Sequence, residues 1–173
     1  MLWSNPSRRR ENTSAIMIDE PLDDLYRDIV LDHTKCPRCR NPLDRVDLSS
    51  DGHNPVCGDE VQVCLKVSGD RVEDICVRSR GCSISTASGS IMAENVKGKT
   101  REETEKIIAA FRSMIHGNQV PDSIDLGELE ALEGVHKFPI RVKCAMLAWV
   151  TLESALKAWD EGKVKAEQKA STE

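Results

Sequence analysis

The sequence predicts an α+β fold in a single domain. Apolar and polar residues alternate over residues 60–67, the Gly69-Asp70 pair marks a turn, and residues 71–78 repeat the alternation as a returning antiparallel strand. After this hairpin, apolar residues recur mainly at helical spacing. A chain of 173 residues can form one hydrophobic core, and strands that precede a run of helices are typical of α+β proteins.

The other elements follow from apolar spacing and from capping signals. Acidic residues precede the apolar stripe of the first helix, and Thr100 with Glu103 resembles a capping box. One face of the predicted sheet is apolar and therefore needs a cover of helices. Besides the hairpin, the expected elements are a helix over 22–31, a short strand near 45–48, and helices over 83–96, 100–114, part of 118–135 and 142–159.

Composition excludes several classes of partner. The formal net charge is −5 and aromatic residues make up 3% of the chain, so neither a basic field nor stacking residues are available for nucleic acid. The longest apolar run, from Cys144 to Val150, has seven residues, whereas a membrane span needs about 20. We therefore expect a soluble protein that binds neither nucleic acid nor a membrane.

The two ends of the chain are polar and differ from the middle. We expect a flexible N-terminal extension over residues 1–21, an ordered domain over 22–161 and a flexible C-terminal tail over 162–173. The chain has seven cysteines, an odd number, and no secretory leader is evident at its start. Such cysteines are typical of a reducing compartment, and we expect the cytoplasm.

Three cysteines and one aspartate border turn signals or element ends. Cys57 and Asp59 flank Gly58, Cys82 follows Gly81, and Cys144 lies near the start of the last predicted helix. Three thiolates and a carboxylate form the ligand inventory of a tetrahedral metal site. Buried free cysteine is also common as a small apolar residue, and the spacing by itself names no metal.

Four further cysteines leave alternatives open. Cys36 and Cys39 form a C-x-x-C pair, which occurs in zinc ribbons and in redox pairs. A ribbon could combine them with Cys57 and Cys64, and a disulfide, a second sulfur relay or no role are the other interpretations. Cys64 and Cys76 occupy strand positions and are interpreted as sheet residues.

Five ordered motifs resemble the SufU branch of the IscU/NifU N-terminal family. The resemblance covers about residues 22–157. It implies a three-stranded antiparallel sheet packed against about five helices, with a metal site exposed at one end. The motifs are Leu25-Tyr26-Arg27, Asp32-His33, Asn54-Pro55-x-Cys57-Gly58-Asp59, Arg80-Gly81-Cys82-Ser83-Ile84-Ser85 and Lys137-Phe138-Pro139-x-Arg141-x-Lys143-Cys144-Ala145-x-Leu147-Ala148-Trp149.

Two features assign the chain to this branch. Lys143 stands where scaffold-type members of the family carry histidine, and an extra segment spans about residues 117–135. The resemblance implies that Cys57, Asp59, Cys82 and Cys144 bind Zn²⁺. It also implies that the protein accepts sulfur from a cysteine desulfurase of the SufS type and passes it to downstream iron–sulfur assembly proteins.

In the family mechanism, Cys57 is the sulfur acceptor. A histidine of the desulfurase replaces Cys57 on the zinc ion, and Cys57 is released as a thiolate that is already deprotonated. A free cysteine with a pKa of about 8.5 would be mostly protonated at neutral pH. Arg141, which we count as catalytic, could steady the acceptor thiolate or the docking interface, or be a surface residue. Asp59 could instead be a turn residue. We expect a monomer or weak dimer.

Two other functions compete with this prediction. The same cysteines could assemble a [2Fe–2S] cluster in a scaffold protein without enzymatic activity. Alternatively, the zinc could be purely structural in a binding module. Closed structural zinc sites favour four Cys or Cys/His ligands, so the carboxylate of Asp59 counts against the structural role.

Overall fold

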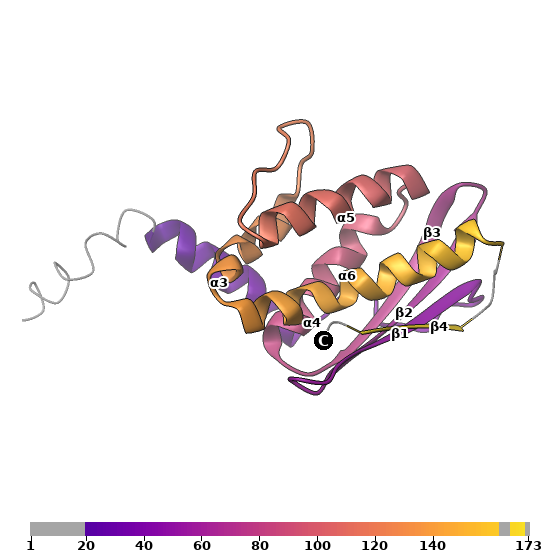
Figure 1. Cartoon of the computed structure of the whole chain (residues 1–173), viewed down its shortest axis with the longest axis horizontal. Helices are drawn as coiled ribbons and strands as arrows, with labels where there is room; N and C mark the ends of the chain where they lie inside the picture. Colours follow the sequence, from indigo (N-terminus) through magenta and orange to yellow (C-terminus); the bar gives the residue numbers. More distant parts are fainter. Residues whose placement is uncertain (1–19, 163–166, 172–173) are drawn as a thin grey trace, which may run out of the picture.

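The computed structural model describes residues 20–162 and 167–171 (Figure 1). Within these residues, no helix is both long and apolar enough to cross a membrane. The elements in chain order are α3 (Glu20–Lys35), β1 (Leu48–Asn54), β2 (Asp59–Ser68), β3 (Arg71–Arg80), α4 (Ser83–Val96), α5 (Arg101–Ile115), the 3₁₀ helix η1 (Gly127–Lys137), α6 (Pro139–Asp160) and β4 (Glu167–Ser171).

The sheet has the strand order β3-β2-β1-β4. Strands β1, β2 and β3 pair antiparallel, which confirms the three-stranded antiparallel sheet. Strand β4 adds a fourth, because it pairs parallel with β1. The segment 162–173, expected to be a flexible tail, therefore contains a strand. Residues 1–19 of the expected extension and residues 163–166 and 172–173 of the expected tail lie outside the described residues.

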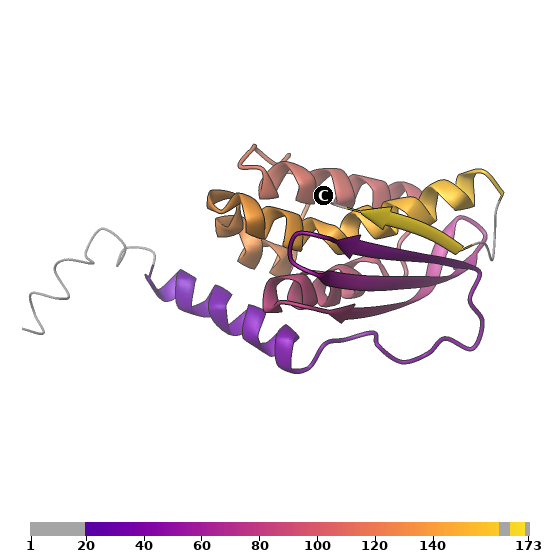
Figure 2. The same ribbon diagram turned by 60° about the horizontal axis from the view of Figure 1, so that its bottom comes forward.

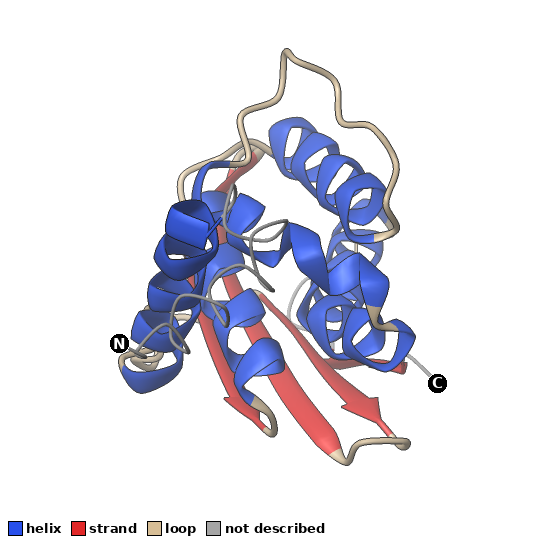
Figure 3. Cartoon of the chain, turned by 90° about the vertical axis from the view of Figure 1, so that its left-hand side faces the viewer, coloured by secondary structure: helices blue, strands red, loops and turns tan. Residues whose placement is uncertain are grey.

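The helices cover one face of the sheet, as predicted (Figures 2 and 3). Helix α6 packs on β1 and β2, α4 packs on β3 and on α6, and α3 and α5 lie further out. The alternation in β2 places Val61, Val63 and Leu65 in the core. Between α5 and α6, the rings of Phe111 and Trp149 stack with their centroids 4.4 Å apart.

Strand β1 corrects the sequence prediction. The short strand expected near residues 45–48 is instead a seven-residue strand from Leu48 to Asn54. Its buried face consists of Leu48, Ser50, Gly52 and Asn54, and a face with one apolar residue gives no period-two signal. Small residues are needed here because α6 packs closely on the strand: a Cβ atom at Gly52 would lie 2.0 Å from Thr151 Oγ1.

The predicted helices are present, with one difference in type. Helix α4 has the expected bounds, and α5 begins after Thr100, whose side chain forms a capping box with Glu103. Helices α3 and α6 extend the predicted ranges at both ends. The acidic helix expected within residues 118–135 is a 3₁₀ helix, η1, which begins inside this range and ends two residues beyond it.

The close approach of α6 to β1 can be tested with Gly52→Ala. The added methyl group would clash with Thr151 Oγ1, so we expect the free energy of unfolding to fall by about 1–3 kcal/mol. Gly134→Ala is the matched control, because a Cβ atom there meets nothing within 4 Å. Urea unfolding measures both variants. Equal stability of the two variants would contradict the packing described here.

Candidate metal and sulfur site

The turn between β1 and β2 presents Cys57 at one end of the sheet. Asn54 organises this turn: its carbonyl oxygen accepts from the Gly58 N–H at 2.7 Å, and its side-chain Oδ1 accepts from the Val56 N–H at 3.1 Å. Gly58 has a φ of 76°, a conformation that glycine adopts without steric cost. The Cys57 side chain is therefore held at the tip of the turn, exposed to solvent.

Asp59 links this turn to the turn between β3 and α4. Its side chain is buried, and its Oδ1 accepts a hydrogen bond from the Cys82 N–H at 3.0 Å. The Cys82 thiol lies 3.5 Å from Asp59 Oδ2. A Cβ atom on Gly81 would lie 2.1 Å from Asp59 Oδ1. The absence of a side chain at Gly81 therefore makes room for the carboxylate.

Cys82 is the N-cap residue of α4. Its Sγ accepts a hydrogen bond from the Ser85 N–H at 3.4 Å. The N-terminal end of a helix carries a partial positive charge, which attracts anionic groups. The helix predicted over residues 83–96 is thus present and begins directly after Cys82.

Cys144 completes the cluster from α6. Its side chain is buried, and its Sγ lies 3.4 Å from Cys57 Sγ. Burial raises the pKa of the Cys144 thiol far above its ordinary value, and hydrogen bonds with Cys57, Asp59 and Cys82 add to the rise. In the protein without a cation, Cys144 therefore stays protonated, because a further negative charge among these groups is unfavourable.

The four residues, called the thiol cluster below, have a donor set that fits Zn²⁺. Ligand atoms of Cys57, Asp59 and Cys144 lie within 4.8 Å of one another, and Cys82 adjoins them through Asp59. Two sulfur atoms on a tetrahedral zinc ion are roughly 3.8 Å apart, from Zn–S bonds of about 2.3 Å. The 3.4 Å separation between the sulfur atoms of Cys57 and Cys144 is close to this value.

Arg141 is not part of this cluster in the structure. It lies in the first turn of α6 with its side chain exposed, and it makes no hydrogen bond or ion pair within the described part of the chain. It lines a surface depression with Lys137 and Phe138. Its expected catalytic role stays a prediction.

The other cysteines lie apart from the thiol cluster. Cys64 and Cys76 are directly paired across β2 and β3, in agreement with their interpretation as sheet residues. Cys39 lies beside β3, where its carbonyl oxygen accepts from the Val77 N–H at 2.8 Å. Cys57 instead contacts Cys144, so the structure gives no support to a ribbon that combines Cys57 with the C-x-x-C pair.

A second group of possible ligands was missed by the sequence prediction. His33, Glu94 and Glu128 have ligand atoms within 4.8 Å of one another. These residues come from α3, α4 and η1, and no spacing pattern connects them. Only the occurrence of His33 in one of the family motifs pointed to this position.

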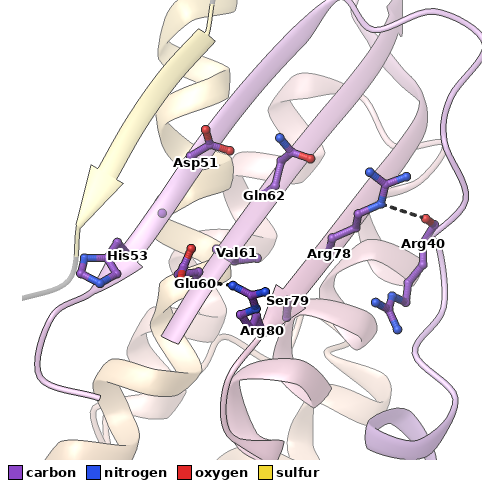
Figure 4. A pocket seen from close by; sticks show the side chains of 10 residues that line it. Arg40, Asp51, His53, Glu60, Val61, Gln62, Arg78, Ser79 and Arg80 are labelled. Atoms are coloured by element: carbon purple, nitrogen blue, oxygen red, sulfur yellow. Dashed lines mark hydrogen bonds and ion pairs between the residues drawn. The ribbon is translucent and has the colours of Figure 1, made fainter. Parts of the chain in front are cut away.

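The face of the sheet opposite the helices carries a shallow polar groove (Figure 4). Arg78 Nε donates to the Arg40 carbonyl oxygen at 3.4 Å, and Arg80 pairs with Glu60 at 4.0 Å. The groove contains no cysteine, and the charges that line it have both signs. The nucleophiles therefore lie at the strand ends, outside this groove.

A mainly antiparallel sheet covered by helices on one face, with thiols and a carboxylate meeting at its end, agrees with the fold and site that the sequence motifs imply for an iron–sulfur assembly protein. Residues 25–145 match the protein family described as the NifU-like N-terminal domain. The chain belongs to this family.

Relatives with different names match most of the chain. It is 45% identical over 141 residues to the zinc-dependent sulfurtransferase SufU of Bacillus subtilis. The aligned region covers 82% of this chain and 95% of the relative. It is 43% identical over 136 residues to the iron–sulfur cluster assembly scaffold protein IscU of Streptococcus pyogenes. This alignment covers 79% of this chain and 85% of the relative.

Solved structures support the same fold. A crystal structure from Fervidobacterium islandicum AW-1, described as an iron–sulfur cluster assembly scaffold protein for the SUF system, matches with a TM-score of 0.70 at 32% identity. The match covers 74% of this chain and 93% of that chain. The resemblance seen in the sequence motifs is thereby confirmed.

The burial of the cysteines predicts different rates of alkylation in the metal-free protein. Cys57 should react with iodoacetamide much faster than Cys144, because Cys57 is exposed, whereas burial limits access to Cys144 and raises its pKa. A raised pKa reduces the thiolate fraction at a given pH, so the rate at Cys144 should rise as the solution becomes more alkaline. Peptide mass mapping over time measures each site.

Two other cysteines serve as controls for this experiment. Cys36 is exposed and should react fast, whereas Cys76 is buried and should react slowly. Similar rates for Cys57 and Cys144, with Cys76 still slow, would contradict the placement of Cys144.

Proposed function

We propose that this chain is a zinc-dependent sulfurtransferase that accepts persulfide sulfur from a cysteine desulfurase for iron–sulfur cluster assembly in the cytoplasm. The observation that carries the proposal is the unequal exposure of the thiol cluster. Cys57 is exposed at the tip of a turn, whereas Cys144 and Asp59 are buried behind it. One thiol is thus open to a partner while the other groups stay in place.

Cys57, Asp59, Cys82 and Cys144 are the proposed zinc ligands. The helix N-terminus and the Ser85 N–H orient Cys82, and the Cys82 N–H orients Asp59. Zinc bound there would supply the positive charge that keeps the thiols deprotonated at neutral pH. The protein's own contribution is to hold three of the groups rigidly and to leave Cys57 on the most accessible element.

Cys57 is the proposed nucleophile in sulfur transfer. Its Sγ attacks the outer sulfur of the desulfurase cysteine persulfide. A new S–S bond forms on Cys57 while the S–S bond of the desulfurase breaks, and the electron pair leaves with the desulfurase cysteine as a thiolate. The exchange consumes no oxidant or reductant, because one persulfide replaces another.

Apolar side chains near the thiol cluster support docking of a protein partner. Val56 precedes Cys57, and Phe138 and Ile140 lie at the start of α6; all three are more than half exposed. Exposed large apolar residues beside a site are typical of protein interfaces. We propose a desulfurase of the SufS type as this partner, with Arg141 on the docking surface beside Phe138.

A scaffold that assembles a [2Fe–2S] cluster is the second candidate. The similarity to the scaffold protein of Streptococcus pyogenes favours it. Lys143, which precedes Cys144, counts against it, because a protonated lysine has no lone pair with which to replace a histidine ligand. Lys143 is also exposed.

The nucleophile can be tested with Cys57→Ser. We expect persulfide formation on the protein and stimulation of alanine release by the desulfurase to fall at least about tenfold, since a hydroxyl group cannot replace the thiolate. Mass spectrometry and an alanine assay measure the two effects. Cys36→Ser is the matched control, because Cys36 is exposed and lies outside the thiol cluster. Persistent sulfur acceptance by Cys57→Ser would refute the assignment.

The metal can be tested by analysis and removal. We expect about one zinc per chain after aerobic purification and no iron–sulfur chromophore. Chelation should lower the melting temperature, because metal binding contributes several kcal/mol to folding in such sites. Elemental analysis and calorimetry measure these outcomes. Brown protein with stoichiometric iron and sulfide would favour the scaffold, and an unchanged melting temperature would contradict a zinc site.

A further inference from the structure

His33, Glu94 and Glu128, called the histidine cluster below, lie far from the thiol cluster. His33 is on α3, Glu94 is near the end of α4, and Glu128 is on η1. Cys82 caps the start of α4, and Ser90, which contacts His33, lies about 12 Å further along the helix at a rise of 1.5 Å per residue. No ligand of the proposed zinc site belongs to this group.

The imidazole of His33 is held in one orientation. The ring is fully buried, and its Nδ1 lies 2.7 Å from Ser90 Oγ. The same hydroxyl oxygen accepts the backbone N–H of Arg38 at 2.8 Å. A serine oxygen can accept two hydrogen bonds, so Ser90 can also accept the proton of His33 Nδ1. This arrangement matches the outer-shell contact that typically orients a metal-binding histidine.

The other ring nitrogen of His33 faces two carboxylates. Nε2 lies 3.0 Å from Glu128 Oε1 and 3.7 Å from Glu94 Oε1. Without a cation, an Nε2–H group donates a hydrogen bond to Glu128. With the proton on Nδ1 instead, the Nε2 lone pair and the two carboxylates can face one cation. Ligand atoms on a tetrahedral zinc ion are roughly 3.3 Å apart for Zn–N and Zn–O bonds of about 2.0–2.1 Å. The two observed distances lie on either side of this value.

Among the groups that interact electrostatically around Arg38, three carboxylates face this one guanidinium. Glu94, Glu128 and Asp32 are acidic, and Arg38 is the nearby cation. The guanidinium of Arg38 is committed to Asp32, with Nη2 2.5 Å from Asp32 Oδ2. That hydrogen bond raises the pKa of Arg38, and the charges of Glu94 and Glu128 add to the rise. Because Arg38 is paired with Asp32, a divalent cation could balance the charges of Glu94 and Glu128.

We propose that His33, Glu94 and Glu128 form a second metal site, which binds a first-row divalent cation through one imidazole nitrogen and two carboxylate oxygens. The two glutamates are partly exposed, so water can enter and complete the coordination. Such ligands suit Zn²⁺, Mn²⁺, Fe²⁺ and Co²⁺ and contain no thiolate. The bound cation joins η1, part of the extra segment, to α3 and α4.

Titration of the zinc-loaded protein with Co²⁺ tests this proposal. We expect about one further equivalent to bind with weak visible absorption and without the intense sulfur-to-cobalt charge-transfer bands of a thiolate site. Binding should also raise the melting temperature, since the cation joins three elements of the folded chain. If the thiol cluster does not hold zinc, the protein would contain no zinc before the titration, or the added Co²⁺ would give the sulfur-to-cobalt charge-transfer bands. Either result is distinguishable from failure of the second site.

Glu94→Gln combined with Glu128→Gln should weaken this Co²⁺ binding at least about tenfold and abolish the melting shift. The glutamine side chains keep their size at partly exposed positions, so the fold should be retained, and circular dichroism checks this. The matched control is Glu130→Gln combined with Glu133→Gln on η1, outside the cluster, which should bind Co²⁺ like the parent. The proposal is overturned if the parent takes up no further Co²⁺, if uptake shows only thiolate bands, or if the Glu94/Glu128 variant binds as tightly as the parent.

Discussion

The proposed zinc site depends on one contact between two turns, the hydrogen bond from the Cys82 N–H to the buried Asp59 carboxylate. A carboxylate buried at the start of β2 needs a donor, and the turn after β3 supplies it because Gly81 leaves room for the oxygen atoms. The contact joins the β1–β2 turn, which carries Cys57, to the N-terminus of α4. It therefore sets the relative positions of three of the four proposed ligands.

The fourth ligand, Cys144, is positioned by the packing of α6. Gly52 allows this helix to lie close to β1, and Ser88 on α4 donates to the Ala145 carbonyl oxygen at 2.7 Å. Trp149, one turn further along α6, donates through Nε1 to the same Ser88 hydroxyl at 2.9 Å. These contacts hold α6 against β1 and against α4 in the core. The depth of Cys144 behind the exposed Cys57 therefore follows from helix packing.

Local sequence patterns were sufficient to predict the helices and strands in which buried residues recur at a regular spacing. The alternation in β2 and β3, the capping box of α5 and the bounds of α4 were all predicted from neighbouring residues. Strand β1 was misplaced because all but one residue of its buried face are small or polar, so that the face gives no apolar period. The buried residues of η1, Leu129, Leu132 and Val135, recur at every third position. The helix type was missed because this spacing also fits one face of a short α-helix.

The sequence by itself determined the α+β class, the family and the kinds of ligand available, because motifs and periodicity are properties of neighbouring residues. The spacing of the seven cysteines left open which of them meet, and only the family resemblance implied a particular set. Only the tertiary structure brought Cys57 to Cys144 while separating both from the C-x-x-C pair, and only it gathered His33, Glu94 and Glu128 from three elements. The reason is physical: contacts between residues remote in the sequence arise from the packing of whole helices on the sheet, which no local pattern encodes.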